Sequence, residues 1–519
     1  MAFAGERGAV EGYPDRASAM PGESVGLCCA GVGRFSVEVA RLGEKREVVW
    51  RRDDVEAADH PVPADAAQHG CDWPVTFQVP IGNDWRSGCY EVDLIPSDGS
   101  PSRQTCFAVR APRGRRAPFL LVMATATDAA YNDWGGLNLY TGAVESSLRR
   151  PLGHGFVRRP ADAYLRHAHT IGPEGKTIDD VDVSGSRRLH DIEAHHLSPW
   201  VAETGWSNWE GPFVRWAESQ GYQIDVATST DLHRDPECLF GYNAMLSVGH
   251  DEYWSWEMRD AVEAFVGSGG NAAFFSGNNA CWQVRFDADC ARMTSYKFMG
   301  PFEDPVVGTP DERRMTGLWS DPMIGRPENH LTGVSFTRGG YVRFGYGVAR
   351  GSGGYTVWRP RHWVFEGTSL GYGDQLGADA VVVGYEADGC ALGLENNLPV
   401  PTGEDGTPVD MEVLATSPAH LWSGFAPIPE MPPPQRPATV MPADIEYVAM
   451  RLFGDWSETN VAKIAAGNAV MGVFTRAGGG TTFTTGCTDW ARGLHPKVDP
   501  DVARVTANVL DRLGALDAN

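Results

Sequence analysis

A run of five apolar residues, Phe119-Leu120-Leu121-Val122-Met123, constrains the fold of this chain more than any other segment. It follows a polar, proline-bounded stretch at 110–118. A strand whose side chains are all apolar is expected to be buried on both faces, which is typical of a parallel sheet covered by helices. We therefore expect a domain to begin near residue 113 with this strand.

The segments downstream alternate between helical and strand-like patterns. Apolar spacing predicts a helix over 213–218 that stops at Gly221, and an amphipathic helix over 256–266. Strands are expected at 223–227, 244–248, 271–275, 469–474 and 481–485, with a last helix over 502–513. This alternation predicts an α/β fold with a parallel sheet.

The remaining segments predict further domains, since single cores stop growing at roughly 250–300 residues and this chain has 519. Short alternating runs between Gly, Pro and Asp turns predict a β-sandwich at the N-terminus. The expected organisation is a β-sandwich (1–112), the first part of the α/β core (113–300), a β-rich insertion (301–426), a Pro-rich linker (427–443) and the C-terminal part of the core (444–519).

Charge and cysteine usage narrow the possible partners and compartment. The formal net charge of −23 disfavours nucleic acid and anionic membrane surfaces. The first residues have no apolar signal segment, and no stretch approaches the roughly 20 apolar residues of a membrane span. The ten cysteines form no CxxC pair, which favours reduced thiols. We therefore expect a cytoplasmic protein.

Polar clusters follow three of the predicted strands. They lie at 130–140, 249–254 and 276–279, and they contain phenols, carboxylates, an imidazole and amides. Ligands of open α/β sheets bind beyond the carboxyl ends of the strands, so we expect these clusters to share one rim. Phenolate and carboxylate oxygens suit a hard cation such as ferric iron, and a metal is the simplest way to activate water toward an amide.

Other constellations give alternative hypotheses. His167-Ala168-His169 and the histidines at 190–196 have spacings that could bind a divalent metal, although their polar, Gly-rich surroundings favour a solvated loop. Cys281, with His250 as base, would make a cysteine-dependent amidase, although a buried inert thiol is favoured because no Gly-x-Cys-x-Gly elbow accompanies it. The 17 tryptophans also suit a non-catalytic carbohydrate- or ligand-binding protein. Asp251 is expected to cap the helix that follows it.

Several ordered motifs resemble the large (beta) subunit of N,N-dimethylformamidase. They lie at 131–136, 139–140, 209–210, 213–216, 249–254, 276–278 and 282–286, with weaker similarity at 384–389 and 486–490. The resemblance is strongest over 119–300. It implies a core like that of a class I glutamine amidotransferase without its nucleophilic cysteine, and a mononuclear non-haem Fe(III) held by two tyrosines and one glutamate.

The resemblance also implies roles for particular residues. The metal ligands would be Tyr131, Tyr164 and Glu252, with Tyr140 as the alternative second tyrosine. His250 and Asn278 would orient water or substrate, and Glu386 would be the general base, with Glu395 as its alternative.

The implied activity is iron-dependent cleavage of the C–N bond of a small amide or formamide by metal-activated water. The implied assembly is a homo-oligomer, with a small accessory subunit as a further expected partner. The chain is shorter than that large subunit, and we therefore expect it to lack an additional β-rich, lectin-like domain. The resemblance leaves the amide substrate open.

Overall fold

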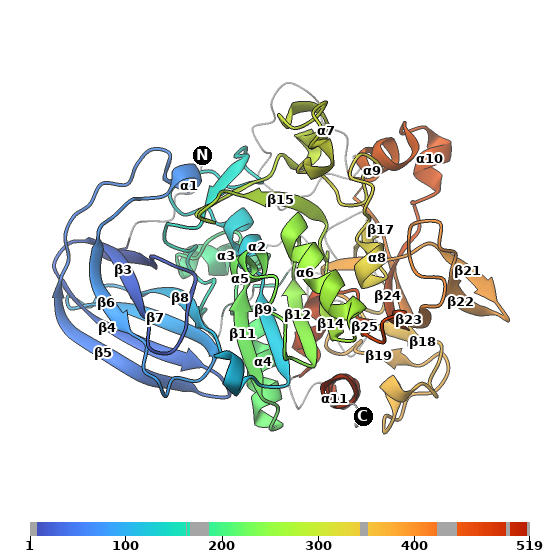
Figure 1. Cartoon of the computed structure of the whole chain (residues 1–519), viewed down its shortest axis with the longest axis horizontal. Coiled ribbons are helices and arrows are strands. Elements are labelled where there is room, and N and C mark those ends of the chain that lie inside the picture. The colour runs from blue at the N-terminus through green and yellow to red at the C-terminus, as the bar shows by residue number, and fades with distance from the viewer. Residues whose placement is uncertain are drawn as a thin grey trace.

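The computed structural model describes residues 8–161, 163, 165–166, 186–342, 351–422, 444–494 and 499–515. A nine-stranded sheet runs through the middle of the molecule (Figure 1). Its first five strands are parallel, and each later strand is antiparallel to its neighbour. In sheet order the strands are β11 (Ile224–Thr228), β9 (Phe119–Met123), β12 (Ala244–His250), β14 (Asn271–Gly277), β25 (Thr481–Thr484), β24 (Gly467–Thr475), β23 (Glu412–Ala419), β18 (Tyr355–Val357) and β19 (Gln375–Leu376).

Helices cover both faces of the parallel part of this sheet. Leu121 of β9 packs in one apolar cluster with α4 (Glu210–Ser219) and α11 (Pro500–Gly514). Its neighbour Leu120 packs in another cluster with α5 (Ser229–Arg234) and α6 (Trp256–Gly267). Alternate side chains of a strand point to opposite faces, so every residue of β9 enters a core. This is the physical reason for the unbroken apolar run, and burying each leucine contributes about 1.5–3 kcal/mol.

The residues before β9 form two sheets at one end of the molecule, coloured blue in Figure 1. Side chains from both sheets, such as Leu27 and Val39, meet in one apolar cluster. One sheet contains β1 (Val10–Pro14), β3 (Ser24–Gly31) and β6 (Val75–Pro80). The other contains β2 (Ser18–Ala19), β8 (Arg103–Val109), β7 (Gly88–Pro96), β4 (Arg34–Leu42) and β5 (Arg46–Glu56).

The region expected to be an insertion contributes strands to several sheets. Its strands β18, β19 and β23 extend the central sheet, while β17 (Ser335–Tyr341) pairs with β20 (Glu386–Gly389). A hairpin of β21 (Leu392–Glu395) and β22 (Leu398–Pro401) projects at the right of Figure 1. The predicted Pro-rich linker, 427–443, lies outside the described residues.

A further sheet of four strands includes the chain that leaves the end of β12. Its order is β10 (Glu145–Ser147), β16 (Arg292–Thr294), β15 (Trp282–Phe286) and β13 (Tyr253–Ser255). The remaining α-helices are α1 (Ala66–His69), α2 (Thr125–Tyr131), α3 (Ser186–Ala194), α7 (Gly300–Glu303), α8 (Asn329–Thr332), α9 (Asp444–Phe453) and α10 (Glu458–Ala462).

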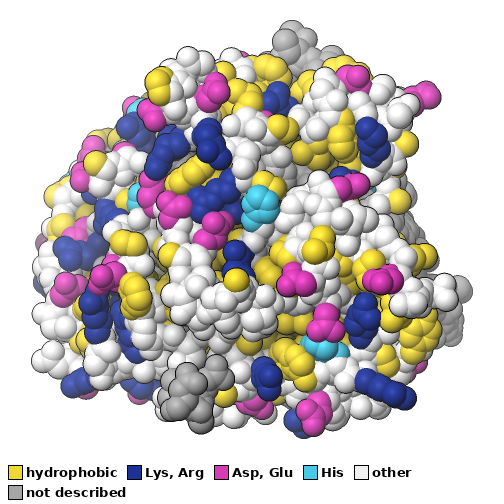
Figure 2. Space-filling model, turned by 45° about the vertical axis from the view of Figure 1, so that its right-hand side comes forward, with side chains coloured by type: hydrophobic (Ala, Val, Ile, Leu, Met, Phe, Trp, Pro, Cys, Tyr) yellow, Lys and Arg dark blue, Asp and Glu magenta, His cyan; other side chains and the backbone are white. Residues whose placement is uncertain are grey.

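The described parts of the chain contain no helix with the length and apolarity needed to cross a bilayer. On the face shown in Figure 2, the coloured Lys and Arg side chains lie among Asp and Glu side chains rather than in one continuous patch.

Candidate active site

The ends of neighbouring parallel strands bring distant parts of the sequence together. The last residue of β12, His250, pairs with Gly277, the last residue of β14. Glu252 and Asn278 therefore follow strands that end at the same level of the sheet. The next strand along, β9, leads into the short helix α2, whose last residue is Tyr131. This topology creates a site at the carboxyl edge of the sheet, where ligands of α/β proteins bind.

Three oxygen-bearing side chains meet at this edge. The Tyr131 hydroxyl donates a hydrogen bond to Glu252 Oε2 at 2.9 Å. Tyr140 Oη lies 2.5 Å from Tyr131 Oη and 2.8 Å from Glu252 Oε1. Tyr131 and Glu252 are 2% and 3% exposed, and the two tyrosine rings stack with centroids 4.3 Å apart. Two phenols and a carboxylate thus form a cluster of oxygen donors, which we call the oxygen cluster; Tyr140 is its one half-buried member.

Neighbouring side chains fix the orientation of the oxygen cluster. The Trp282 indole donates a hydrogen bond to Glu252 Oε1 at 2.8 Å, and the Tyr253 hydroxyl donates to Tyr140 Oη at 2.9 Å. Lys297 Nζ lies 3.1 Å from the centre of the Tyr140 ring, a cation–π contact. Burial lowers the pKa of Lys297 to about 8, although Glu252 acts in the opposite direction.

His250 connects the oxygen cluster to a second carboxylate. His250 Nε2 lies 3.3 Å from Glu252 Oε2 and 2.7 Å from Glu386 Oε2. Its Nδ1 faces the main-chain carbonyl oxygen of Glu203 at 2.7 Å. Asn278 Nδ2 donates to Glu386 Oε2 at 3.1 Å. An imidazole whose two nitrogens both face acceptors either carries two protons or shares one with its carboxylate partner. The pair of His250 and Glu386 is therefore a place where a proton can be held and passed on.

Burial and neighbouring charge set the ionisation of these groups. Burial disfavours the imidazolium, but Glu386 and Glu252 outweigh it and raise the pKa of His250 to about 10. Burial first, and then the charge of Glu252, raises the pKa values of Tyr131 and Tyr140 well above the ordinary phenol value. The two phenols therefore keep their protons unless a positive charge is added beside them.

The structure brings most of the predicted site residues to one place. The residues that meet there are Tyr131, His250, Glu252, Asn278 and Glu386. Tyr164 lies outside the described residues, whereas Tyr140, the alternative second tyrosine, lies in the oxygen cluster. Glu395, the alternative base, is exposed on the β21–β22 hairpin, away from these groups.

The prediction that Asp251 caps the following helix is wrong. The strand β13 intervenes, and Ser255 is the N-cap of α6, with its Oγ accepting from Met258 N. The Asp251 carboxylate instead accepts hydrogen bonds from Trp254 Nε1 at 2.9 Å and Ser247 Oγ at 2.7 Å. Asp251 therefore supports the loop between β12 and β13.

Sequence reasoning gave no role to Lys297, Tyr253 or Trp282. Tyr253 and Trp282 lie in the motifs at 249–254 and 282–286, so membership of these motifs is the sequence signal that could have indicated a role for them. Lys297 begins a one-turn 3-10 helix, η2 (Lys297–Met299), at a positive φ of 52°. Nothing in the periodicity around it indicates that it is buried.

The rival sites receive little support from the structure. Cys281 is 2% exposed, and burial, followed by the charge of Glu252, raises the pKa of its thiol well above the ordinary value. Its proposed base, His250, has both ring nitrogens engaged by Glu386 and Glu203. Within the described ranges, no group of three or more His, Cys, Asp or Glu is placed to hold a metal ion. His167 and His169 lie outside the described residues.

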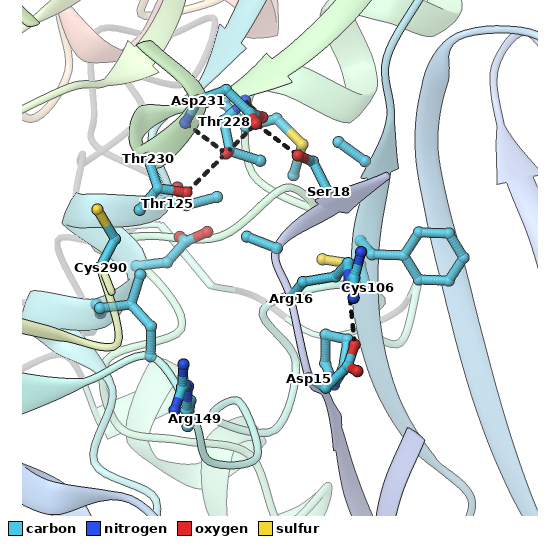
Figure 3. Close-up of a pocket in the computed structure, with 18 of the residues that line it drawn as sticks. Asp15, Arg16, Ser18, Cys106, Thr125, Arg149, Thr228, Thr230, Asp231 and Cys290 are labelled. Carbon is cyan, nitrogen blue, oxygen red and sulfur yellow. Dashed lines mark hydrogen bonds and ion pairs between the residues drawn. The ribbon is translucent and has the colours of Figure 1, made fainter. Parts of the chain in front are cut away.

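A cavity of about 570 Å³ lies between the N-terminal sheets and the carboxyl ends of β9 and β11 (Figure 3). Thr125, on α2, lines the cavity, while the last residue of α2, Tyr131, belongs to the oxygen cluster. Several polar side chains of the lining bind one another: Ser18 Oγ donates to Asp231 at 2.5 Å and Thr228 Oγ1 donates to it at 2.8 Å. None of the three residues of the oxygen cluster lines this cavity.

The sequence is similar to known proteins over most of its length. The family described as "N,N-dimethylformamidase beta subunit-like, C-terminal" matches residues 36–502. A relative from Paracoccus aminophilus named N,N-dimethylformamidase beta subunit is 24% identical over 472 residues, which cover 85% of this chain and 54% of the relative. One of the same name from Alcaligenes sp is 24% identical over 474 residues, with the same coverage. The chain spans about half the length of these curated relatives.

Proposed function

The chain belongs to the family of N,N-dimethylformamidase beta subunit-like proteins, and on that premise we propose that it hydrolyses the C–N bond of a small amide or formamide. The observation that carries the proposal is the contact between His250 and both carboxylates. His250 Nε2 lies within 3.3 Å of Glu252, in the oxygen cluster, and 2.7 Å from Glu386, outside it. The oxygen cluster, whose side chains suit a metal ion, thus lies directly beside the pair of His250 and Glu386, which suits acid–base chemistry.

The oxygen cluster is the proposed site of a mononuclear non-haem Fe(III). Tyr131, Tyr140 and Glu252 supply two phenols and a carboxylate, the hard oxygen donors that suit such an ion. Their raised pKa values fit this assignment, because a buried site with several acidic oxygens favours an added positive charge. When bound, a metal ion supplies Lewis acidity that polarises a carbonyl group and acidifies water. We take Tyr140 as the second tyrosine because its phenol lies in this cluster.

The neighbouring side chains would move protons and stabilise charge. Glu386 takes a proton from the attacking water while the water oxygen forms a bond to the amide carbon. The developing oxyanion accepts a hydrogen bond from the second hydrogen of Asn278 Nδ2, whose first hydrogen bonds Glu386. It accepts another from His250 Nε2–H, which turns from Glu386 to the oxyanion once Glu386 has taken the proton. The C–N bond then breaks as the leaving nitrogen takes the proton from Glu386. The products are a carboxylic acid and an amine, with no change of oxidation state.

The assembly is also part of the proposal. The two curated relatives are named as beta subunits, a name for one component of an enzyme with several subunits. We propose that this chain works in a homo-oligomer with a small accessory subunit.

The proposed activity is tested by assaying the iron-loaded full chain with formamide, N-methylformamide, N,N-dimethylformamide and acetamide. We expect stoichiometric release of acid and amine from at least one of them. Glu386→Gln should lower kcat by roughly 10²–10⁴-fold, the range of general acid–base catalysis. Glu395→Gln is the matched control, since it makes the same change of charge on the exposed hairpin and should retain activity. Failure of the iron-loaded chain to hydrolyse any of the four amides would contradict the proposal.

A further inference from the structure

The turn that presents Asn278 to the site has an unusual backbone. Asn278 has a φ of 52° and Ala280 has a φ of 49°. Residues other than glycine rarely adopt this left-handed region, and asparagine tolerates it best. Asn278 is only 2% exposed, so solvent does not stabilise its backbone groups. Specific contacts must therefore hold the turn in this conformation.

The carboxylate of Asp388 supplies those contacts. Asp388 Oδ1 accepts a hydrogen bond from the backbone N–H of Asn278 at 2.9 Å. Asp388 Oδ2 accepts one from the backbone N–H of Asn279 at 3.0 Å and one from Asn279 Nδ2 at 2.8 Å. One buried carboxylate thus binds two consecutive main-chain N–H groups directly after β14.

The strand β20 delivers this carboxylate together with the proposed base. Glu386 and Asp388 are two residues apart on β20, so their side chains leave the same face of the strand. Glu386 binds the Asn278 side chain, and Asp388 binds the Asn278 backbone. The Asp388 backbone N–H is itself anchored to the carbonyl oxygen of Gly486 at 3.0 Å. The relative positions of Asn278 and Glu386 are therefore set by a single short strand.

The Asn278 side-chain amide cannot rotate without losing its contacts with Glu386 and His250. Its Nδ2 donates to Glu386 and lies 3.4 Å from His250 Nε2. Its Oδ1 is buried and has no hydrogen-bond partner among the described residues. A substrate N–H group or a water would satisfy this oxygen. A rotation of the turn would displace the donor and the acceptor together.

We propose that Asp388 is a positioning residue of the hydrolytic site, which acts by holding Asn278 in the conformation that directs its amide toward Glu386 and His250. The effect on rate rests on the proposed function. The rest of the turn has separate supports: Ser276 Oγ donates to Asn279 Oδ1 at 2.5 Å, and Ala280 N–H donates to the carbonyl oxygen of Asp251 at 2.8 Å. Loss of one acceptor oxygen of Asp388 should therefore loosen Asn278 without dismantling the site.

The test is Asp388→Asn in the iron-loaded full chain. The carboxylate accepts from the main-chain N–H groups of Asn278 and Asn279 and from Asn279 Nδ2, whereas an amide has only one acceptor oxygen. We expect kcat to fall by roughly 10–100-fold, as for supporting residues of metal sites, with unchanged iron content. The matched control is Asp304→Asn, another buried aspartate that binds a main-chain N–H, that of Thr316 at 2.8 Å, outside the site. It should lose stability but keep kcat.

A double variant separates positioning from a general structural role. Asn278→Gly removes the amide and relieves the left-handed backbone, so adding Asp388→Asn should cause no further loss of kcat. The proposal would be overturned if the fall in kcat of the double variant equalled the product of the two single falls. Full activity of Asp388→Asn alone would also overturn it. If Asp388→Asn does not fold, Asp388→Glu keeps the charge but moves it by one methylene group. A fall of roughly 10–100-fold in the kcat of Asp388→Glu would then support the proposal, and full activity of that variant would overturn it.

The inference can fail separately from the proposed function. If the wild-type chain hydrolyses no amide, a crystal structure of Asp388→Asn still tests the positioning claim. We expect the Asn278 backbone to leave the left-handed region and Nδ2 to leave Glu386. An unchanged Asn278 would overturn the inference whatever the substrate.

Discussion

The phenol oxygens of Tyr131 and Tyr140 lie 2.5 Å apart, although the two residues are nine positions apart in the sequence. The chain reverses between them: Asn138 Nδ2 donates to the carbonyl oxygen of Tyr131 at 2.9 Å, and Leu139 N–H donates to that of Ala130 at 3.1 Å. The loop after α2 thus returns its second tyrosine to the first. This reversal completes the proposed metal site with Tyr131 at the end of α2, Tyr140 in the loop that follows it, and Glu252 just after β12.

Replacing Trp282 with phenylalanine should weaken iron binding. The change removes the indole N–H that orients Glu252 Oε1 and preserves an aromatic ring. Loss of such a supporting hydrogen bond typically lowers metal affinity by roughly 10–100-fold. Competition with a chelator measures the effect. Trp358→Phe is the control, because that indole donates to Thr416 Oγ1 at 2.8 Å, at β18 and β23. Equal iron affinity in both variants would contradict the assignment of Glu252.

Replacing His250 with glutamine should reduce turnover and leave the iron in place. His250 touches Glu252 and Glu386, but none of the three proposed ligand oxygens belongs to it. We expect kcat to fall by roughly 10²–10³-fold, since an oxyanion donor and the contact that holds Glu386 are both lost. The control is His420→Gln, because His420 Nδ1 contacts the main-chain oxygen of Ala465 at 2.6 Å instead of a carboxylate of the site. Loss of iron from His250→Gln would assign this imidazole a ligand role instead.

Replacing Cys281 with alanine should leave catalysis largely intact. The thiol is buried and its pKa is raised, so it is a poor nucleophile at neutral pH. The smaller alanine side chain leaves a cavity in the core, which lowers stability. We therefore expect a lower melting temperature with a retained kcat. Thiol alkylation of the folded wild type should also be slow. An inactive but folded, iron-containing Cys281→Ala protein would revive the cysteine mechanism.

Acid should remove the stabilisation that Asp304 provides. Burial raises the pKa of this carboxyl, but hydrogen bonds from Arg285 at 2.8 and 2.9 Å and from Thr316 outweigh it and hold the pKa below its ordinary value. A depressed folded-state pKa contributes stability above the unfolded pKa of about 3.9, and this contribution is lost as the pH falls. At pH 7, Asp304→Asn should lower the free energy of unfolding by about 2 kcal/mol. Denaturant titrations should show this difference shrinking below about pH 4, and a constant difference would contradict the account.

The sequence predicted the strands of the parallel part of the core because their side chains enter two cores. It also predicted that Tyr131, His250, Glu252 and Asn278 would meet, since each follows a strand end. It did not predict the antiparallel strands on one side of the sheet. The five residues between β24 and β25 leave only a hairpin possible, because a parallel connection needs a dozen or more residues. The short connection at 476–480 could therefore have predicted the antiparallel pairing of β24 and β25.

The contacts of Lys297 and Asp388 had no such signal. Lys297 reaches the Tyr140 ring from a one-turn helix, and Asp388 binds a turn 110 residues earlier. Such contacts depend on tertiary packing rather than on periodicity. Spacing likewise does not show where a loop reverses, so the position of Tyr140 beside Tyr131 could not be predicted from the sequence.

The most direct test of the account is the iron content and visible spectrum of three proteins: wild type, Tyr140→Phe and Tyr164→Phe. The wild type should hold about one iron per chain, as a mononuclear site requires, and show a tyrosinate-to-iron charge-transfer band. Tyr140→Phe should lose iron and colour, while Tyr164→Phe keeps both. Retention of iron and an unchanged band in Tyr140→Phe would contradict the assignment of the oxygen cluster as the metal site.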